Sequence, residues 1–116
     1  MWHRGEIWLA NLDPAQGTEP GKTGPVLIVQ AQALLEGGHP STLIIPVTTN
    51  VIADAAPLRV HVPAAGRLRR AADLLIDQLR AIDNRRLVQG PLTRLPPSLM
   101  REVAAAIGEV LELDEG

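Results

Sequence analysis

Apolar residues occur in short runs separated by turn residues, and four runs predict strands: residues 6–12, 25–30, 42–48 and 58–62. The second run contains an uninterrupted Val-Leu-Ile-Val, which suits a strand buried on both faces. Pro46 lacks an N–H, so we expect the third strand at a sheet edge or at a bulge. The fourth run alternates, which predicts that its apolar residues Leu58, Val60 and Val62 face the core. Residues 31–41 hold two glycines and a proline and predict an irregular connector.

Residues 71–87 fit two different structures. Helix-forming residues are frequent there, and three apolar residues fall on one helical face: Leu75, Leu79 and Ile82. The same segment also fits a strand, residues 74–82, with a break near Gln78. Periodicity alone does not decide between the two.

The last element is clearer. After two prolines at 96 and 97, which favour a helix start, apolar residues recur at helical spacing. They are Leu99, Val103, Ile107, Val110 and Leu111. Short strands with one terminal helix predict a small, strongly bent β-sheet or barrel packed against that helix.

The composition narrows the class of protein. A chain of 116 residues is one domain of ordinary size. The absence of cysteine excludes disulfides, thiolate metal sites and a thiol nucleophile. No apolar run approaches the ~20 residues that a membrane span needs, and the N-terminus lacks the apolar stretch of a signal peptide. We therefore expect a soluble, cytoplasmic protein with no membrane association.

The charges argue against a general nucleic-acid binder, because the net charge is -2. Residues 59–101, however, carry nine arginines and three aspartates, and residues 102–116 carry five acids and no base. This asymmetry fits either a basic surface or a scattered set of solvated arginines. The chain has two tryptophans and no phenylalanine or tyrosine, so it lacks a row of aromatic side chains on which bases could stack. Any binding of nucleic acid therefore relies on arginines and backbone groups. Three histidines have no metal-ligand spacing, and the last, His61, points to the outer face of its strand.

The densest polar segment is the loop between the first two strands, residues 13–24. It holds three glycines, two threonines, one lysine and one glutamate. A long polar loop between two buried strands is a common place for the site of a small β-protein.

Taken in order, several short segments resemble the MazF/PemK (Kid) family of toxin endoribonucleases. The matching segments are R-G-E-I-W-L at 4–9, D-P at 13–14, G-T-E at 17–19, G-K-T-G-P-V-L-I-V-Q at 21–30, I-P-V-T-T-N at 45–50, L-I-D-Q-L-R-A-I-D at 75–83 and R-L at 86–87. The resemblance implies a mainly β fold with a C-terminal helix, a small SH3-like or PemK-like barrel. It implies a strand in the 74–82 region, which we prefer over the helix for that reason. It also implies a homodimer that cuts single-stranded RNA without metal or cofactor, and a MazE-like antitoxin partner.

RNA carries its own nucleophile, the 2′-hydroxyl, so the protein must orient that group, move two protons and stabilise charge on phosphorus. In the family, an arginine before the second strand and a threonine after the third do this work. The threonine corresponds to Thr48, whose alternative role is a local hydrogen bond to the backbone. The family's acidic loop position corresponds to Glu19, which can accept a proton, contact a base or lie exposed.

The family arginine corresponds to Gly24, and this is the main departure from the family pattern. Engineered inactivation, natural loss of activity, and replacement of the charge by Lys22 are three explanations. A fourth is that the turn requires a backbone angle that favours glycine. Loss of one donor to a developing oxyanion costs roughly 100- to 1,000-fold in rate, so we expect weak cleavage or none, with retained binding of RNA and antitoxin.

The resemblance also implies a set of substrate-binding residues: Lys22, Thr23, Thr49, Asn50, Asp77, Gln78 and Arg80. In an extended segment, Gln78 and Arg80 share a face and can contact a base and a phosphate. The alternative is a structural ion pair between Asp77 and Arg80. Two other functions stay open, a gyrase poison like CcdB, which shares the fold, and a decoy that binds antitoxin.

Overall fold

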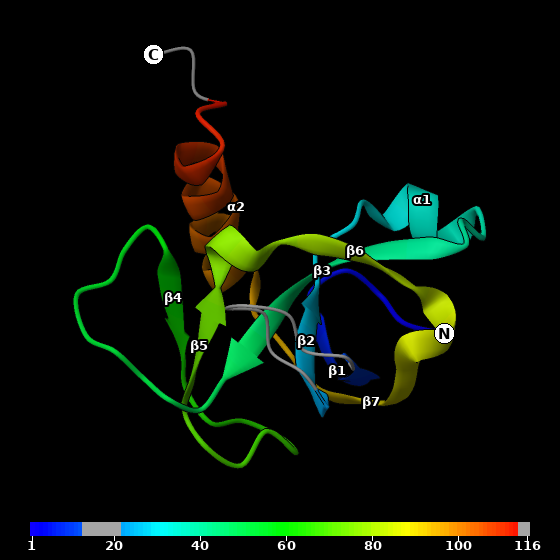
Figure 1. Cartoon of the computed structure of the whole chain (residues 1–116), viewed down its shortest axis with the longest axis horizontal. Helices are drawn as coiled ribbons and strands as arrows, with labels where there is room; N and C mark the ends of the chain where they lie inside the picture. Colours follow the sequence, from blue (N-terminus) through cyan, green and yellow to red (C-terminus); the bar gives the residue numbers. More distant parts are fainter. Residues whose placement is uncertain (13–21, 114–116) are drawn as a thin grey trace.

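The computed structural model describes residues 1–12 and 22–113, and within these ranges the chain forms a bent β-sheet with two α-helices (Figure 1). The strands are β1 (Glu6–Asn11), β2 (Thr23–Ile28), β3 (Ser41–Thr48), β4 (Arg59–Val62), β5 (Ala72–Leu75), β6 (Arg80–Asp83) and β7 (Leu87–Arg94). The helices are α1 (Gln32–Glu36) and α2 (Pro97–Val110), and two 3-10 turns are η1 (Ile76–Gln78) and η2 (Asn84–Arg86). The predicted class, mainly β with a C-terminal helix, is confirmed.

Strand β3 joins the two halves of the sheet. The strand order is β4-β5-β3-β2-β1-β7, and β6 also pairs with β3. All the pairings described are antiparallel. On one side β3 has a single partner, β2, whereas on the other side β6 pairs with residues 41–44 and β5 pairs with residues 47–48. The end of β3 therefore lies in the middle of the sheet, between β2 and β5.

The expectation that Pro46 marks an edge strand is wrong. Pro46 lies opposite Val26 on the β2 side. On its other side it falls between Ile44, the last residue paired with β6, and Val47, the first residue paired with β5. A proline without an N–H is tolerated here because neither β5 nor β6 pairs with that position.

The strand interpretation of residues 71–87 is confirmed, including the break near Gln78. Strand β5 ends at Leu75, η1 interrupts the extended chain, and β6 begins at Arg80 and continues antiparallel to β3. Pairing with β3 prevails over the helical propensity of this segment, as tertiary contacts commonly do. The sequence did not predict helix α1, within residues 31–41, or strand β7.

Strand β7 passes close to the Trp8 ring, and this requires a glycine at position 90. A Cβ at Gly90 would lie 2.6 Å from Trp8 Cγ, closer than packed atoms allow. Trp8 in turn meets Trp2 edge-on, with ring centroids 5.9 Å apart. Only a residue without a side chain lets the backbone approach an indole this closely.

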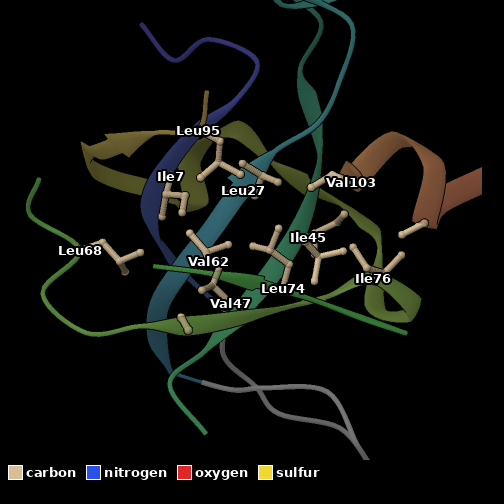
Figure 2. Close-up of a cluster of buried hydrophobic side chains, with 13 residues drawn as sticks. Ile7, Leu27, Ile45, Val47, Val62, Leu68, Leu74, Ile76, Leu95 and Val103 are labelled. Carbon is tan, nitrogen blue, oxygen red and sulfur yellow. The ribbon is translucent and has the colours of Figure 1, made fainter. Parts of the chain in front are cut away.

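The core lies on both faces of β2. Leu27 points into a cluster with Ile7, Ile45 and Leu74, against which α2 packs through Val103 (Figure 2). The neighbours of Leu27 on β2 point the other way, into a second cluster: Val26 and Ile28 join Ile44, Ile82 and Leu87. The continuous apolar run is therefore buried on both faces, as predicted.

Two residues predicted to be in the core are exposed. Leu58 lies in the turn before β4 and is 49% exposed, whereas Val60 and Val62 are buried as expected. Leu111 follows the last residue of α2 and is 51% exposed. In both cases the apolar pattern of the sequence is longer than the element itself, which begins after Leu58 or ends before Leu111.

Candidate active site at the end of strand β3

Four positions on neighbouring strands form one row across the sheet. Thr48 on β3 is opposite Asp73 on β5, and Asp73 is opposite His61 on β4. On the other side, β2 and β3 pair as far as Val26 and Pro46, and Gly24 and Thr48 each lie two residues beyond that pair, so they point to the same face as Val26 and Pro46. Residues directly opposite each other in an antiparallel pair present their side chains on the same face. Positions 24, 48, 73 and 61 therefore share one face of the sheet.

The backbone at position 24 does not require a glycine, and the space where a side chain would begin is empty. Its φ does not lie in the left-handed region, so the explanation that the turn needs a glycine angle is wrong. A Cβ built at Gly24 would meet no heavy atom within 4 Å. A side chain can therefore start from this position without a clash at its Cβ, on the face that carries Thr48.

The Thr48 hydroxyl is held by a local hydrogen bond. Its oxygen accepts from the backbone N–H of Asn50 at 3.1 Å. This bond uses a lone pair of the hydroxyl and leaves the O–H group able to donate. The local role and the functional role therefore coexist, because the bond to Asn50 fixes the oxygen while its hydrogen can point to a phosphate.

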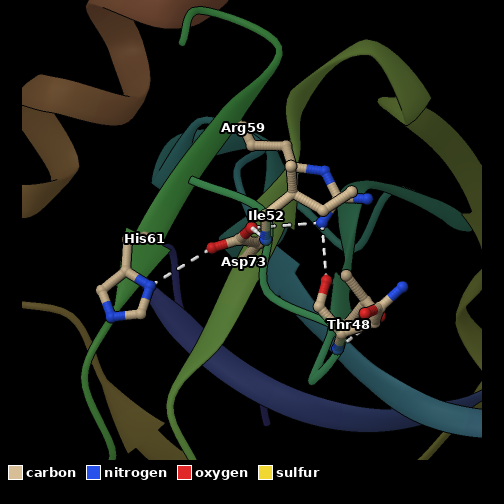
Figure 3. A network of polar contacts seen from close by, with 6 residues as sticks. Thr48, Ile52, Arg59, His61 and Asp73 are labelled. Atoms are coloured by element: carbon tan, nitrogen blue, oxygen red, sulfur yellow. Dashed lines mark hydrogen bonds and ion pairs between the residues drawn. The ribbon is translucent and has the colours of Figure 1, made fainter. Parts of the chain in front are cut away.

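A buried carboxylate lies next to Thr48 (Figure 3). Asp73 is 1% exposed, and its Oδ2 accepts from the Ile52 N–H at 2.9 Å and from Arg59 Nη1 at 3.1 Å. Its Oδ1 lies 3.2 Å from His61 Nδ1. Arg59 Nη1 also donates to the Asn50 carbonyl at 2.7 Å. Asp73 and Arg59 together fix the segment that follows Thr48.

The topology explains why Asp73 is buried on an outer face. Strands β3 and β4 are both antiparallel to β5, so they run parallel to each other. Their connection, residues 49–58, starts at one end of β3 and must return past β5 to begin β4. In doing so it brings the Ile52 N–H onto the Asp73 carboxylate.

The hydrogen bonds keep Asp73 charged. Burial by itself raises the pKa of this carboxyl, but donation from the Ile52 N–H, Arg59 and His61 more than offsets that effect. The net result is a pKa below the ordinary value, 3.8. At neutral pH, Asp73 is therefore a charged carboxylate, and the guanidinium of Arg59 compensates its charge.

The sequence did not identify Asp73 or Arg59 as site residues. One available indication was the alternation in Leu-Arg-Val-His-Val, which places Arg59 and His61 on the same face of β4. The outer-face position predicted for His61 is confirmed, since its side chain is 55% exposed. The partner of Arg59 and His61 is fourteen and twelve residues away in the chain, beyond the reach of any local pattern.

Several predicted residues lie directly after β3 or at the start of β2. Thr49 and Asn50 form the exposed bend after β3, and Thr23 lies opposite Asn11 at the start of β2. Lys22 is exposed and has a positive φ of 63°, and its carbonyl accepts from the Leu12 N–H. Glu19 lies outside the described residues.

The remaining predicted residues lie in η1 and at the start of β6. Arg80 is opposite Ile44, four residues before Thr48 and therefore about 13 Å away along the strand. Gln78 lies in η1, so the argument that Gln78 and Arg80 share a face of an extended segment is wrong. Asp77 also lies in η1, and the ion pairs of the described chain do not include one between Asp77 and Arg80.

Residues 1–12 and 22–113 contain neither a metal-binding cluster nor a helix able to cross a membrane. No three acidic or histidine side chains there come together in a way that could hold a metal ion. Neither α-helix in these ranges combines the length and the apolar character that a bilayer crossing requires.

Comparison with known proteins identifies the family. A family described as PemK-like, MazF-like toxins of type II toxin-antitoxin systems matches residues 3–111. An endoribonuclease MazF from Staphylococcus saprophyticus is 32% identical over 108 residues, which cover 92% of this chain and 88% of that protein. The chain belongs to the MazF/PemK toxin family.

Solved structures of MazF proteins share the fold. Mycobacterium tuberculosis toxin MazF-mt6 matches 94% of this chain and 98% of its own, with a TM-score of 0.77 and 26% identity. An endoribonuclease from a mycobacterial species, solved in complex with its cognate antitoxin, matches 100% of both chains with a TM-score of 0.77 and 18% identity. The MazF-like architecture expected from the resemblance is confirmed.

Proposed function

We propose that this MazF/PemK chain is a toxin endoribonuclease that cuts single-stranded RNA, including mRNA, without a metal ion. The observation that carries the proposal is the Thr48 hydroxyl, fixed by the Asn50 N–H at the end of β3. A hydroxyl held in this way can donate to a phosphate oxygen without having to be ordered during the reaction.

The reaction uses the nucleophile of the RNA. The 2′-oxygen forms a bond to phosphorus while the bond from phosphorus to the 5′-oxygen breaks. The 2′-hydroxyl loses a proton, and the 5′-oxygen gains one. The products are a 2′,3′-cyclic phosphate and a 5′-hydroxyl. Thr48 contributes a hydrogen bond to the charge that develops on the phosphate oxygens.

Cleavage by this chain is slow, because Gly24 provides no guanidinium where the family has one. One missing donor to the developing charge lowers the rate roughly 100- to 1,000-fold. The open space at Gly24 supports this reading, since a Cβ added there meets no heavy atom within 4 Å.

The assembly follows from the family. The chain acts as a homodimer in the cytoplasm, where mRNA is present, and its partner is a MazE-like antitoxin. Light scattering at micromolar concentration tests the dimer, and a monomeric mass contradicts it.

The deciding experiment compares this chain with its Gly24→Arg variant on single-stranded RNA in EDTA. We expect 5′-hydroxyl products from both, with a rate roughly 100- to 1,000-fold higher for the variant. A Thr48→Val version of the Gly24→Arg variant serves as the control and should lose most of that gain. If no protein of the set cuts RNA, the nuclease proposal is wrong, and tight antitoxin binding would then favour a decoy.

A further inference from the structure

Arg59 is the arginine that the structure connects to the Thr48 turn. Its Nη1 donates to the Asn50 carbonyl, and the Asn50 N–H donates to the Thr48 hydroxyl oxygen. Only one residue therefore separates the guanidinium from the hydroxyl. Figure 3 shows the Arg59 side chain extending from β4 over this turn. By contrast, Arg80 is opposite Ile44, and Arg86 donates to the Asn11 carbonyl.

The guanidinium keeps donors available for a ligand. Arginine has five N–H groups, and the two hydrogen bonds of Arg59 both come from Nη1. Its Nε and Nη2 donate to no other part of the described chain. Among the described side chains, no nitrogen or oxygen is both buried and unpartnered, so these two nitrogens reach solvent. The side chain as a whole is 19% exposed, which is a restricted opening.

The fold also holds Arg59 in place. Asp73 is buried and accepts from Nη1, so the guanidinium does not have to be ordered when a phosphate arrives. Preorganised donors of this kind are the ones that stabilise developing charge effectively. Because Arg59 and position 24 approach Thr48 from β4 and β2, they flank the same hydroxyl from opposite sides.

We propose that Arg59 is a catalytic residue of this chain, and that it contacts the scissile phosphate in place of the arginine missing at position 24. This inference rests on the proposed nuclease function. Arg59 stays protonated and donates a second N–H, from Nε or Nη2, to a non-bridging phosphate oxygen. As the 2′-oxygen bonds to phosphorus and the 5′-oxygen leaves, the proton of the 2′-hydroxyl passes to water and the 5′-oxygen receives one from water. The slow cleavage expected of the chain depends on this contact.

The test is a double-mutant cycle between Arg59→Lys and Gly24→Arg, with single-turnover cleavage of a long single-stranded mRNA transcript measured in EDTA. Arg59→Lys retains the charge that pairs with Asp73 but loses the planar fork. In the parent chain we expect this change to lower the rate constant of the cleavage step about 10- to 100-fold, with KM little altered. In the Gly24→Arg background, the same change should cost less than about threefold, because another guanidinium contacts the phosphate.

Arg85→Lys is the matched control. Arg85 is also paired with an aspartate, Asp83, but Asp83 is opposite Ser41 at the other end of β3, about 23 Å from Thr48. This variant should cut at the parent rate. Thermal unfolding of each variant identifies any loss of rate that follows from unfolding.

The outcomes separate the two proposals. An equal cost of Arg59→Lys in both backgrounds would show a structural role and overturn the assignment of Arg59. Cleavage by the Gly24→Arg variant with none by the parent chain would also overturn it, while leaving the nuclease function intact. If neither cuts, the proposed function itself fails.

Discussion

Replacement of Asp73 by alanine tests whether the polar network beside Thr48 stabilises the fold. Asp73 is 1% exposed, and its loss leaves the Ile52 N–H without its acceptor. Ile52 is 51% exposed, so water can replace that acceptor in part, whereas loss of one partner of a buried ion pair costs about 3–5 kcal/mol. Without Asp73, the Arg59 guanidinium still donates to the Asn50 carbonyl, and its side chain is 19% exposed to water. Its charge is therefore only partly uncompensated, so the expected loss of stability is near the lower end of the ion-pair range, about 3 kcal/mol.

Asp73→Asn separates charge from shape. The amide oxygen can still accept from the Ile52 N–H and Arg59, and its NH₂ group can face His61 Nδ1. We therefore expect a smaller cost, about 1–2 kcal/mol. Urea unfolding at pH 7 and one protein concentration measures both variants, and the fixed concentration matters if the chain is a dimer. Arg85→Gln breaks an exposed ion pair but keeps the Asp83 cap of η2, so it is the control and should leave the midpoint almost unchanged.

The pH dependence provides a second measurement of the same effect. The folded pKa of Asp73 is lowered, so protonation favours the unfolded chain. The stabilisation is present above the unfolded value, 3.8, and is lost as the pH falls from there through the folded pKa. The parent chain should lose this contribution on acidification and Asp73→Asn should not. A cost of Asp73→Ala below about 1 kcal/mol, or an equal acid sensitivity of the parent and Asp73→Asn, would refute the reasoning.

Two further predictions concern residues away from Thr48. Gly90→Ala should destabilise the fold by about 1–3 kcal/mol, because the new methyl group overlaps the Trp8 indole. The control is Gly108→Ala, whose methyl group meets no atom within 4 Å, so this variant should be neutral or stabilising. Urea unfolding measures both variants. Hydrogen bonds from the Arg85 side chain and backbone lower the pKa of Asp83 to about 2. A carboxyl NMR titration should find that value in the parent and a value nearer 3.8 in Arg85→Gln, and an unchanged value in the variant would contradict the assigned cause.

The elements that the sequence predicted are those with local causes. The Val26–Ile28 run is buried on both faces, and the spacing of Leu99, Val103 and Ile107 places α2 against the core. Strand β7 was not predicted, because Gly90 and Pro91 interrupt its apolar pattern. The reason for Gly90 is the Trp8 ring on β1, and a contact so distant in sequence leaves no local pattern. Pro46 was misplaced for a similar cause, since the change of partner from β6 to β5 is a property of the folded sheet.

The site residues also divide into those that the sequence could identify and those whose role depends on the folded sheet. Thr48 and Gly24 were identified through the family resemblance, and the structure places them on one face by register. The shared face expected for Gln78 and Arg80 required an extended chain, which η1 interrupts. Asp73 has no indication of its own in the sequence. The alternation that includes Arg59 does not single it out, because an arginine on an alternating strand is usually a solvated residue. Their importance depends on the path of residues 49–58, which bring the Ile52 N–H to the Asp73 carboxylate.

That path also connects the stability of the fold to the chemistry of the site. Strands β3 and β4 run parallel with β5 between them, so the connection that follows Thr48 must pass β5. A charged Asp73 beneath it requires a cation, and Arg59 meets that requirement while donating to Asn50, the residue that fixes the Thr48 hydroxyl. The same pairing therefore compensates a buried charge and holds a guanidinium beside the hydroxyl. A chain without an arginine at position 24 thus retains a preorganised one, supplied by a neighbouring strand.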